Sequence, residues 1–163
     1  MNAYSIDNNT FQLTENNQVL SEILYEDLYF LKAEIKVSDT EAYIVKPVGL
    51  FQTSISVTSN GTEIAKLVMN WSGNIVISCR DEKNYVLKLN KFFRGKYIIE
   101  NENRENIIQL TPKFNWKEFH YHYDISSNIS NDHYSKDPLF LSLAVYAANY
   151  FAATISGANS GLV

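Results

Sequence analysis

The clearest candidates for chemistry are cations gathered on one predicted hairpin. The densest positive stretch of the chain runs from residue 80 to residue 96 and is diluted by Asp81 and Glu82. If its last four cations converge at one hairpin end, they can hold a phosphate or an anionic headgroup, because each cation near an anionic membrane contributes about 1 kcal/mol. These candidate ligand-binding residues are Lys88, Lys91, Arg94 and Lys96. The alternative is a solvated hairpin whose charges discourage pairing with another strand.

A second group of chemically able side chains alternates along a strand predicted over residues 117–125. His120, His122 and Asp124 share one face, and His133 follows nearby. Two imidazoles at this spacing can chelate zinc or iron, as in a metal-dependent barrel enzyme. The opposite face carries the large apolar side chains that a core requires, namely Phe119, Tyr121, Tyr123 and Ile125. We therefore predict that the histidines face water and that the chain holds no metal.

No nucleophile in the sequence has a credible base as its partner. Cys79 is the single cysteine, so it cannot form an intramolecular disulfide, which fits a reducing compartment, and we interpret it as a small buried hydrophobe. The chain lacks a P-loop, a glycine-rich dinucleotide motif, a Gly-x-Ser-x-Gly motif and a Cys-x-x-Cys pair. Two tryptophans and eleven tyrosines are typical of cross-strand packing. We predict a protein that is not an enzyme and uses no cofactor.

Composition limits the classes of protein that remain. A chain of 163 residues makes one ordinary domain, and 45% hydrophobic with 20% charged residues is typical of a globular one. The net charge of −4 and a pI near 5.3 lack the basic footprint of a general nucleic-acid binder, so we expect no nucleic-acid partner. Residues 1–10 have no basic region and no apolar run, and we expect no signal sequence there.

Turn signals divide most of the chain into short strands. They recur about every 21 residues, at 16–17, 39, 60–61, 81–82 and 101–103, with other breakers between them at 26–27, 47–49, 72–73, 91–95 and 112–115. Two turns in each period indicate an antiparallel meander, because parallel strands need long crossovers. We expect about twelve strands, over residues 4–7, 10–14, 18–25, 30–37, 41–46, 51–58, 62–71, 74–80, 84–90, 96–101, 106–111 and 117–125. Alternation gives each strand one apolar and one wet face.

The last segment reads as a helix without a polar face. Asp137 is a candidate N-cap, Pro138 suits the first helical position and Gly157 suits the residue after the end. Because no charged residue lies between them, the helix must be surrounded by protein or by lipid. It either fills the lumen of a barrel of about twelve strands or anchors the chain in a membrane. Five alanines and Asn149 favour the lumen.

This pattern resembles the tubby C-terminal-domain-like superfamily, which includes the plant LURP-one-related proteins, the phospholipid scramblases and bacterial relatives. The resemblance rests on the twelve-strand meander, on the apolar helix after Asp137-Pro138 and on the strand-turn-strand segments at 59–64 and 80–85. It implies a closed antiparallel barrel, mainly β, that encloses the C-terminal helix. It also implies binding of phosphoinositide headgroups through basic side chains, although no headgroup motif matches this chain residue by residue.

We therefore expect one domain over residues 1–163, with a meander at 1–125, a loop at 126–136 and the central helix at 137–157. The expected function is that of a non-enzymatic binding module in a bacterial cytoplasm. Its partner is an anionic phospholipid headgroup or another protein, and no integral membrane span is expected. Two alternatives stay open: a tail-anchored protein on a membrane surface, and a metal-dependent barrel enzyme.

Overall fold

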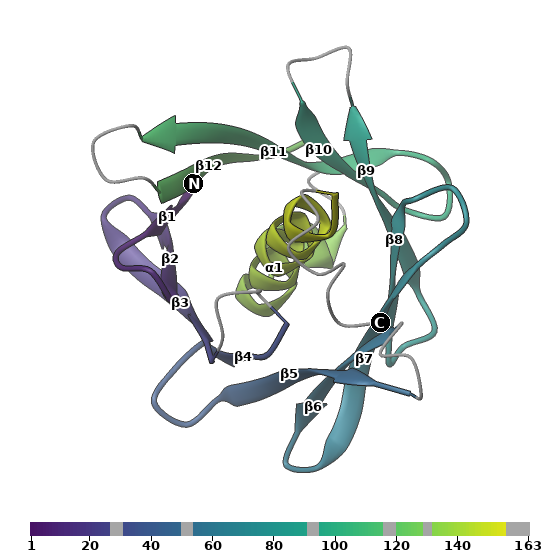
Figure 1. Ribbon diagram of the computed structural model, residues 1–163, viewed down its shortest axis with the longest axis horizontal. Helices are drawn as coiled ribbons and strands as arrows, with labels where there is room; N and C mark the ends of the chain where they lie inside the picture. The colour runs from purple at the N-terminus through teal and green to yellow at the C-terminus, as the bar shows by residue number, and fades with distance from the viewer. Residues whose placement is uncertain (27–30, 50–53, 91–94, 116–119, 129–131, 156–163) are drawn as a thin grey trace.

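The chain folds into a closed antiparallel barrel of twelve strands around one C-terminal helix (Figure 1). This computed structural model describes residues 1–26, 31–49, 54–90, 95–115, 120–128 and 132–155. The elements are β1 (Asn2–Ser5), β2 (Thr10–Glu15), β3 (Gln18–Tyr25), β4 (Ala33–Lys36), β5 (Ala42–Val48), β6 (Ser54–Ser59), β7 (Thr62–Met69), β8 (Ile75–Cys79), β9 (Asn84–Asn90), β10 (Lys96–Glu100), β11 (Asn106–Asn115), β12 (His120–Ser127), η2 (His133–Ser135) and α1 (Pro138–Ile155). The predicted fold class is confirmed, and every predicted strand overlaps an observed one.

The wall is a meander that closes on itself. Each strand pairs with its neighbours in sequence, and β1 pairs with β12 to complete the ring, with Ala3 opposite Tyr123. Because strand direction alternates, all turns signalled by the 21-residue step lie at one end of the barrel. We call this the cap end, since Asp137 caps α1 there, and the opposite end, where α1 finishes, the far end.

The two ends turn differently. Among described residues, every non-glycine residue with a positive φ lies in a cap-end turn, and they are Asn16, Asn17, Asn60, Glu82 and Arg104. Asn60 and Gly61 both have positive φ, which is the conformation that a two-residue hairpin turn requires and that the sequence predicts. The cap-end hairpins are therefore tight.

Two predicted breakers are wrong, because two prolines lie inside strands. Pro47 pairs with Ile55 in β5, and Pro112 pairs with Tyr123 in β11. In a strand, the backbone groups of alternate residues point to the same neighbouring strand. The bond from Val37 N to Glu41 O therefore shows that Pro47 points its nitrogen toward β4, and the bond from Asn128 N to Ile107 O shows that Pro112 points its nitrogen toward β10. Both prolines lie opposite residues that precede the first residue of β4 or β10. A proline costs no ladder hydrogen bond there.

Alternation assigns the faces as predicted. Tyr85 and Leu87 point into the barrel and are buried, whereas Asn84 and Lys88 point outward. Alternation along the strand predicted at 51–58 puts Phe51, Thr53, Ile55 and Val57 on one face; Ile55 and Val57 are buried, and the other two lie outside the described residues. The wall thus surrounds an apolar lumen.

Three strands carry one extra residue just after a cap-end turn. These bulge residues are Leu20, Ile64 and Ile107, opposite register shifts in the β2–β3, β6–β7 and β10–β11 pairs. A bulge increases local twist and bends the strand. All three extra side chains are apolar and pack against or within the core, so the bulges add apolar contacts at the cap end.

The helix α1 fills the lumen. Oδ1 of Asp137 accepts the Phe140 N–H at 2.7 Å, so the predicted N-cap is confirmed; Gly157 lies outside the described residues. By length and composition alone Pro138–Ile155 is apolar enough to cross a membrane, with a mean hydropathy of 1.4, but 67% of it is buried inside the protein. The wall replaces the lipid that an all-apolar helix would otherwise require.

Buried polar contacts set the position of the helix against the wall. Asn149 donates to the Tyr25 hydroxyl at 2.9 Å and accepts from the Tyr123 hydroxyl at 2.8 Å. Near the other end of α1, the hydroxyls of Ser142 and Ser21 lie 2.6 Å apart. Because a buried polar group without a partner costs free energy, these contacts select one register of α1.

Candidate functional site

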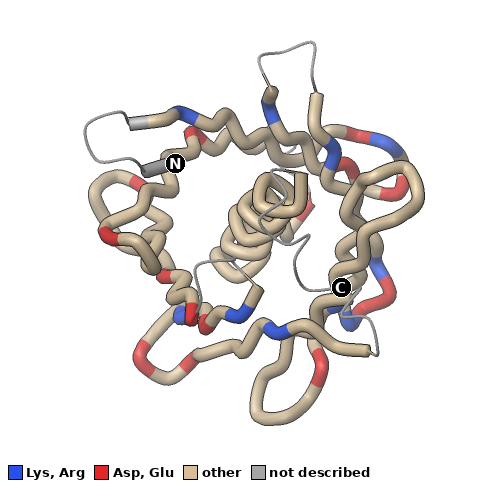
Figure 2. Tube along the Cα trace, viewed as in Figure 1, with Lys and Arg blue, Asp and Glu red and all other residues tan. Residues whose placement is uncertain are grey.

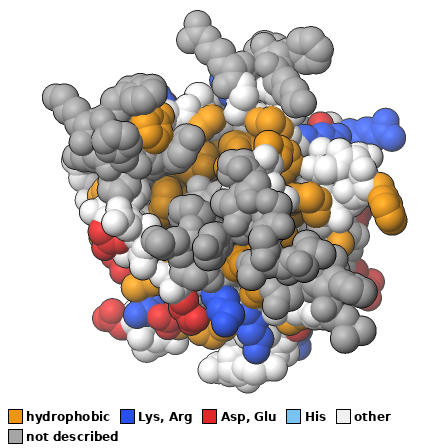
Figure 3. All heavy atoms as spheres, viewed as in Figure 1, with side chains coloured by type: hydrophobic (Ala, Val, Ile, Leu, Met, Phe, Trp, Pro, Cys, Tyr) orange, Lys and Arg blue, Asp and Glu red, His pale blue; other side chains and the backbone are white. Residues whose placement is uncertain are grey.

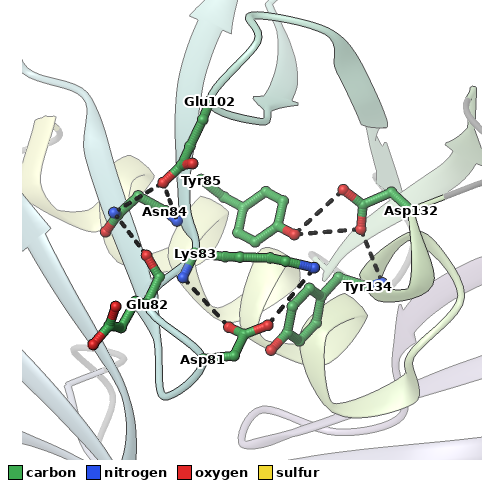
Figure 4. Close-up of polar contacts among 8 residues, drawn as sticks. All are labelled: Asp81, Glu82, Lys83, Asn84, Tyr85, Glu102, Asp132 and Tyr134. Atoms are coloured by element: carbon green, nitrogen blue, oxygen red, sulfur yellow. Dashed lines mark hydrogen bonds and ion pairs between the residues drawn. The ribbon is translucent and has the colours of Figure 1, made fainter.

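Polar side chains gather at the cap end, where the β8–β9 turn meets η2 and the start of α1. The segment predicted as a loop over 126–136 instead extends β12 to Ser127 and forms the 3-10 turn η2. Asp132 begins that turn and accepts the Tyr134 N–H at 3.0 Å. This turn lies across the cap end and brings Asp132 and Tyr134 beside the β8–β9 turn (Figure 4).

Tyr85 connects the turn to the wall. Its side chain lies inside the barrel, 1% exposed, and its hydroxyl donates to both carboxylate oxygens of Asp132 at 3.3 Å. Its ring packs edge-on against Phe140, with centroids 4.7 Å apart, and against Tyr134 at 5.4 Å. Tyr85 therefore couples the wall, η2 and α1 through one side chain.

Lys83 covers the outer side of this cluster. Its ammonium lies 3.7 Å from Asp81 and 5.7 Å above the centre of the Tyr134 ring. An ammonium over an aromatic face gains about 0.5–1 kcal/mol at an exposed site. The β8–β9 turn and η2 are thus held together by charge as well as by packing.

Glu102 joins the neighbouring turn to the cluster. Its Oε1 accepts both the backbone N–H and the side-chain amide of Asn84, each at 3.1 Å (Figure 4). A cavity of about 200 Å³ opens here, lined by polar and charged side chains such as Lys83, Glu102 and Asp132. The sequence separation of Asn84 and Glu102 is closed by pairing of β9 with β10.

The two phenols of the cluster and the neighbouring Cys79 thiol are held in their neutral forms. Burial raises the pKa of Tyr85, and the Asp132 carboxylate raises it further. Burial also raises the pKa of Tyr134, followed by Cys79 and Asp81. For the Cys79 thiol, burial raises the pKa to about 11. Phenols and a thiol that stay protonated at neutral pH donate hydrogen bonds and are poor nucleophiles.

A second cavity, of about 190 Å³, lies on the other side of Tyr134. Its wall is mostly apolar and includes Ile64, Leu139, Phe140 and Leu143, and its charged lining residues are Arg80 and Asp137. A larger surface groove of about 600 Å³ lies between β3 and the β4–β5 turn, where β3 extends past the end of β4.

The predicted basic site is described only in part. Lys88 and Lys96 point outward on β9 and β10, near the far end, whereas Lys91 and Arg94 lie outside the described residues. The Lys88 ammonium lies 2.6 Å from Glu100, so part of its charge is neutralised. Convergence of the four cations stays a prediction.

The predicted histidine face agrees with the structure where it is described. His122 and Asp124 point outward, and Tyr123 and Ile125 are buried; the side chain of His120 is outside the described part. Asp124 pairs with Lys113 at 2.5 Å rather than with an imidazole. Among the described residues, no group of three His, Cys, Asp or Glu side chains could hold a metal ion.

Sequence reasoning missed the cap-end cluster. The sequence predicts a loop around Asp132, and the alternation of the strand at 84–90 places Tyr85 on an apolar face without indicating a polar contact. One signal was present, because Asp132 lies two residues before Tyr134, the spacing at which an aspartate caps a turn. The contact between Asp132 and Tyr85 joins residues 47 apart and has no local signal.

Comparison with known proteins adds no relative: no family model matches the chain, and no curated protein and no solved structure matches it.

Proposed function

We propose that this protein is a non-enzymatic binding module that attaches through its far end to anionic phospholipid headgroups. The observation that carries the proposal is the unequal charge of the two barrel ends. A surface with excess cations attracts anionic membranes, and an acidic one is repelled by them.

The charges divide along the barrel axis. Turns and half-strands at the far end hold six described cations, namely Lys32, Lys46, Lys66, Lys88, Lys96 and Lys113. Two of them are ion-paired, Lys88 with Glu100 and Lys113 with Asp124, so the described charges of this end come close to balance. In the cap-end half the described carboxylates clearly outnumber the described Lys and Arg residues. Figure 2 shows these charges around the ring, while α1 carries none. Among the described residues, the excess of negative charge therefore lies at the cap end.

Trp71 adds an apolar anchor at the far end. It lies in the turn between β7 and β8, and its side chain is fully exposed. In the view of Figure 3, hydrophobic side chains and Lys or Arg side chains both reach the surface. Tryptophan is enriched at membrane interfaces, where its ring lies at headgroup level. The β9–β10 hairpin with Lys88 and Lys96 is the neighbouring hairpin at that end.

The absence of catalysis is part of the proposal. The lumen, where barrel enzymes place their chemistry, is filled by α1, and the Cys79 thiol has a pKa of about 11. We also propose a cytoplasmic location, because a lone cysteine suits a reducing compartment and the cytoplasmic leaflet is the anionic one. Membership of the tubby-like superfamily is proposed on architecture alone, and fold does not carry function.

Vesicle flotation tests the proposal. The full chain is mixed with vesicles of neutral phosphatidylcholine, of phosphatidylcholine with phosphatidylserine, and of phosphatidylcholine with a phosphoinositide. We expect flotation with the anionic vesicles only, and loss of it at high salt, because screening weakens interactions between exposed charges. Equal behaviour with neutral and anionic vesicles would contradict the proposal and favour a protein partner.

Matched variants locate the surface. Lys96→Gln and Trp71→Ser should each reduce flotation several-fold, because they remove a cation or an anchor at the far end. Lys136→Gln removes an exposed cation of the cap end and should leave flotation unchanged. A reduction as large in Lys136→Gln as in Lys96→Gln would show that net charge, and not the far end, governs binding.

A further inference from the structure

The cavity of about 190 Å³ at the cap end is independent of the lipid proposal, because it lies at the opposite end of the barrel. It opens between the wall and the first turns of α1. Three kinds of group line it: an apolar wall, one cation and one carboxylate. This combination is chemically specific.

The apolar part sets the size of what fits. Leu139, Leu143 and Ile64 face the cavity from α1 and β7. An apolar cavity of about 150 Å³ is large enough for benzene. The cavity here therefore accepts an aliphatic or aromatic group of roughly four to six carbon atoms.

The two charged lining residues are separate from one another. Arg80 is exposed, and neither it nor Asp137 forms an ion pair with any described residue. Oδ1 of Asp137 accepts the Phe140 N–H, which leaves the other carboxylate oxygen available to a second donor. Arg80 offers a planar set of donors that matches a carboxylate.

We propose that this cavity binds a free α-amino acid with an apolar side chain, of about the size of leucine. Arg80 receives the carboxylate, Asp137 receives the ammonium, and the side chain lies against Leu139 and Leu143. A carboxylic acid without an ammonium group would pair with Arg80 but leave Asp137 without a partner. A simple amine would pair with Asp137 but leave Arg80 without one. The zwitterion satisfies both groups at once.

The reactivity of Cys79 can show whether the cavity is occupied, although Cys79 has no assigned contact with the ligand. Its thiol lines the same cavity and is the single cysteine of the chain. The thiol is half-buried in this lining, so a ligand that fills the cavity covers it and slows its reaction with a small thiol reagent. The natural sequence needs no added label for this measurement.

Calorimetric titration with three probes tests the chemistry. The probes are L-leucine, 3-methylbutylamine, which lacks the carboxylate, and 4-methylpentanoate, which lacks the ammonium. We expect saturable one-to-one binding of leucine and affinities at least tenfold weaker for the other two. No heat with leucine at 10 mM, or equal affinity for all three probes, would overturn the proposal.

Two charge-removing variants test the residues. Arg80→Gln changes an exposed side chain, and Asp137→Asn keeps an acceptor at the helix N-cap, so both should fold. Each should weaken leucine binding at least tenfold, and Lys136→Gln, next to Asp137, should not. Unchanged binding in both variants would overturn the assignment of the two charges.

The Cys79 reaction places the ligand. Saturating leucine should slow methanethiosulfonate labelling of Cys79 by at least fivefold in the natural chain and have no effect on labelling of Arg80→Gln at the same concentration. If leucine binds but leaves the labelling rate unchanged, it binds elsewhere and the cavity proposal fails.

Discussion

The two ends of the barrel are made from the same meander but are built for different surroundings. At the cap end, η2, the β8–β9 turn and the start of α1 are joined by Tyr85 and Asp132, and the charge is acidic. At the far end, α1 finishes with Ile155 65% exposed, Trp71 projects from its turn, and the described cations and carboxylates come close to balance. The difference teaches that the two ends of an up-and-down barrel can differ in charge and in side-chain contacts although the same strands build both.

The largest expected difference between the ends is in packing. Phe140→Ala should lower the free energy of unfolding by about 3–5 kcal/mol, because the ring is 1% exposed and contacts both Tyr85 and Tyr134. Ile155→Ala at the far end should change it by less than about 0.5 kcal/mol. Urea denaturation measures the free energy of unfolding of both variants. Equal losses in the two variants would contradict the predicted difference in packing between the ends.

A smaller effect is expected at the polar contact deeper in the lumen. Asn149→Leu should lower the free energy of unfolding by about 1–3 kcal/mol, because Tyr25 and Tyr123 lose the amide that lies between them. A double-mutant cycle with Tyr123→Phe separates the contact from the volume change. If the effects of the two substitutions on the free energy of unfolding are additive, Asn149 does not position α1 through Tyr123.

The hydroxyl of Tyr85 should matter less, and its effect should depend on pH. Tyr85→Phe should cost about 1 kcal/mol at neutral pH through loss of its bond to Asp132. Since the folded protein raises the pKa of Tyr85, the unfolded chain ionises first, and the natural protein should lose stability as pH rises above about 10. Chemical denaturation at pH 8 to 11 should show a shallower decline for Tyr85→Phe, and parallel declines would contradict the assigned environment.

The smallest effect is a gain at a cap-end turn. Glu82 has a φ of 67°, a conformation that glycine adopts without strain. Glu82→Gly should therefore raise the free energy of unfolding by up to about 1 kcal/mol, whereas Glu82→Ala should not raise it. Thermal unfolding of the two variants decides the point, and a gain with alanine would assign the effect to charge instead.

Much of the fold could be predicted because its signals are local. Asn60-Gly61 specifies a tight turn by itself, and the repeat of such turns specifies a meander. The charge-free helix requires protein or lipid on every side, and a count of about twelve strands favours an enclosing wall. Closure of β1 on β12 followed from the strand number and not from any single residue.

The sequence-based predictions were wrong or incomplete where the outcome depends on a neighbouring strand or turn. Pro47 and Pro112 break strands in general, and they are tolerated here only because β4 and β10 start later than the level at which the prolines lie. The cap-end cluster depends on Asp132 meeting Tyr85 across the barrel end, which no spacing reveals. The sequence identifies the cations of the β9–β10 hairpin but not their partners. The ion pair between Lys88 and Glu100 depends on the register of β9 and β10.

The seam between the first and the twelfth strand has a consequence for biosynthesis. Because β1 pairs with β12 and α1 follows β12, the ring cannot shut around its helix until β12 and α1 have left the ribosome. Until then the inward faces of the early strands stay uncovered and prone to aggregation, and contacts of such long range form slowly. We therefore expect the nascent chain to need protection from aggregation for longer than a helical protein of similar size does.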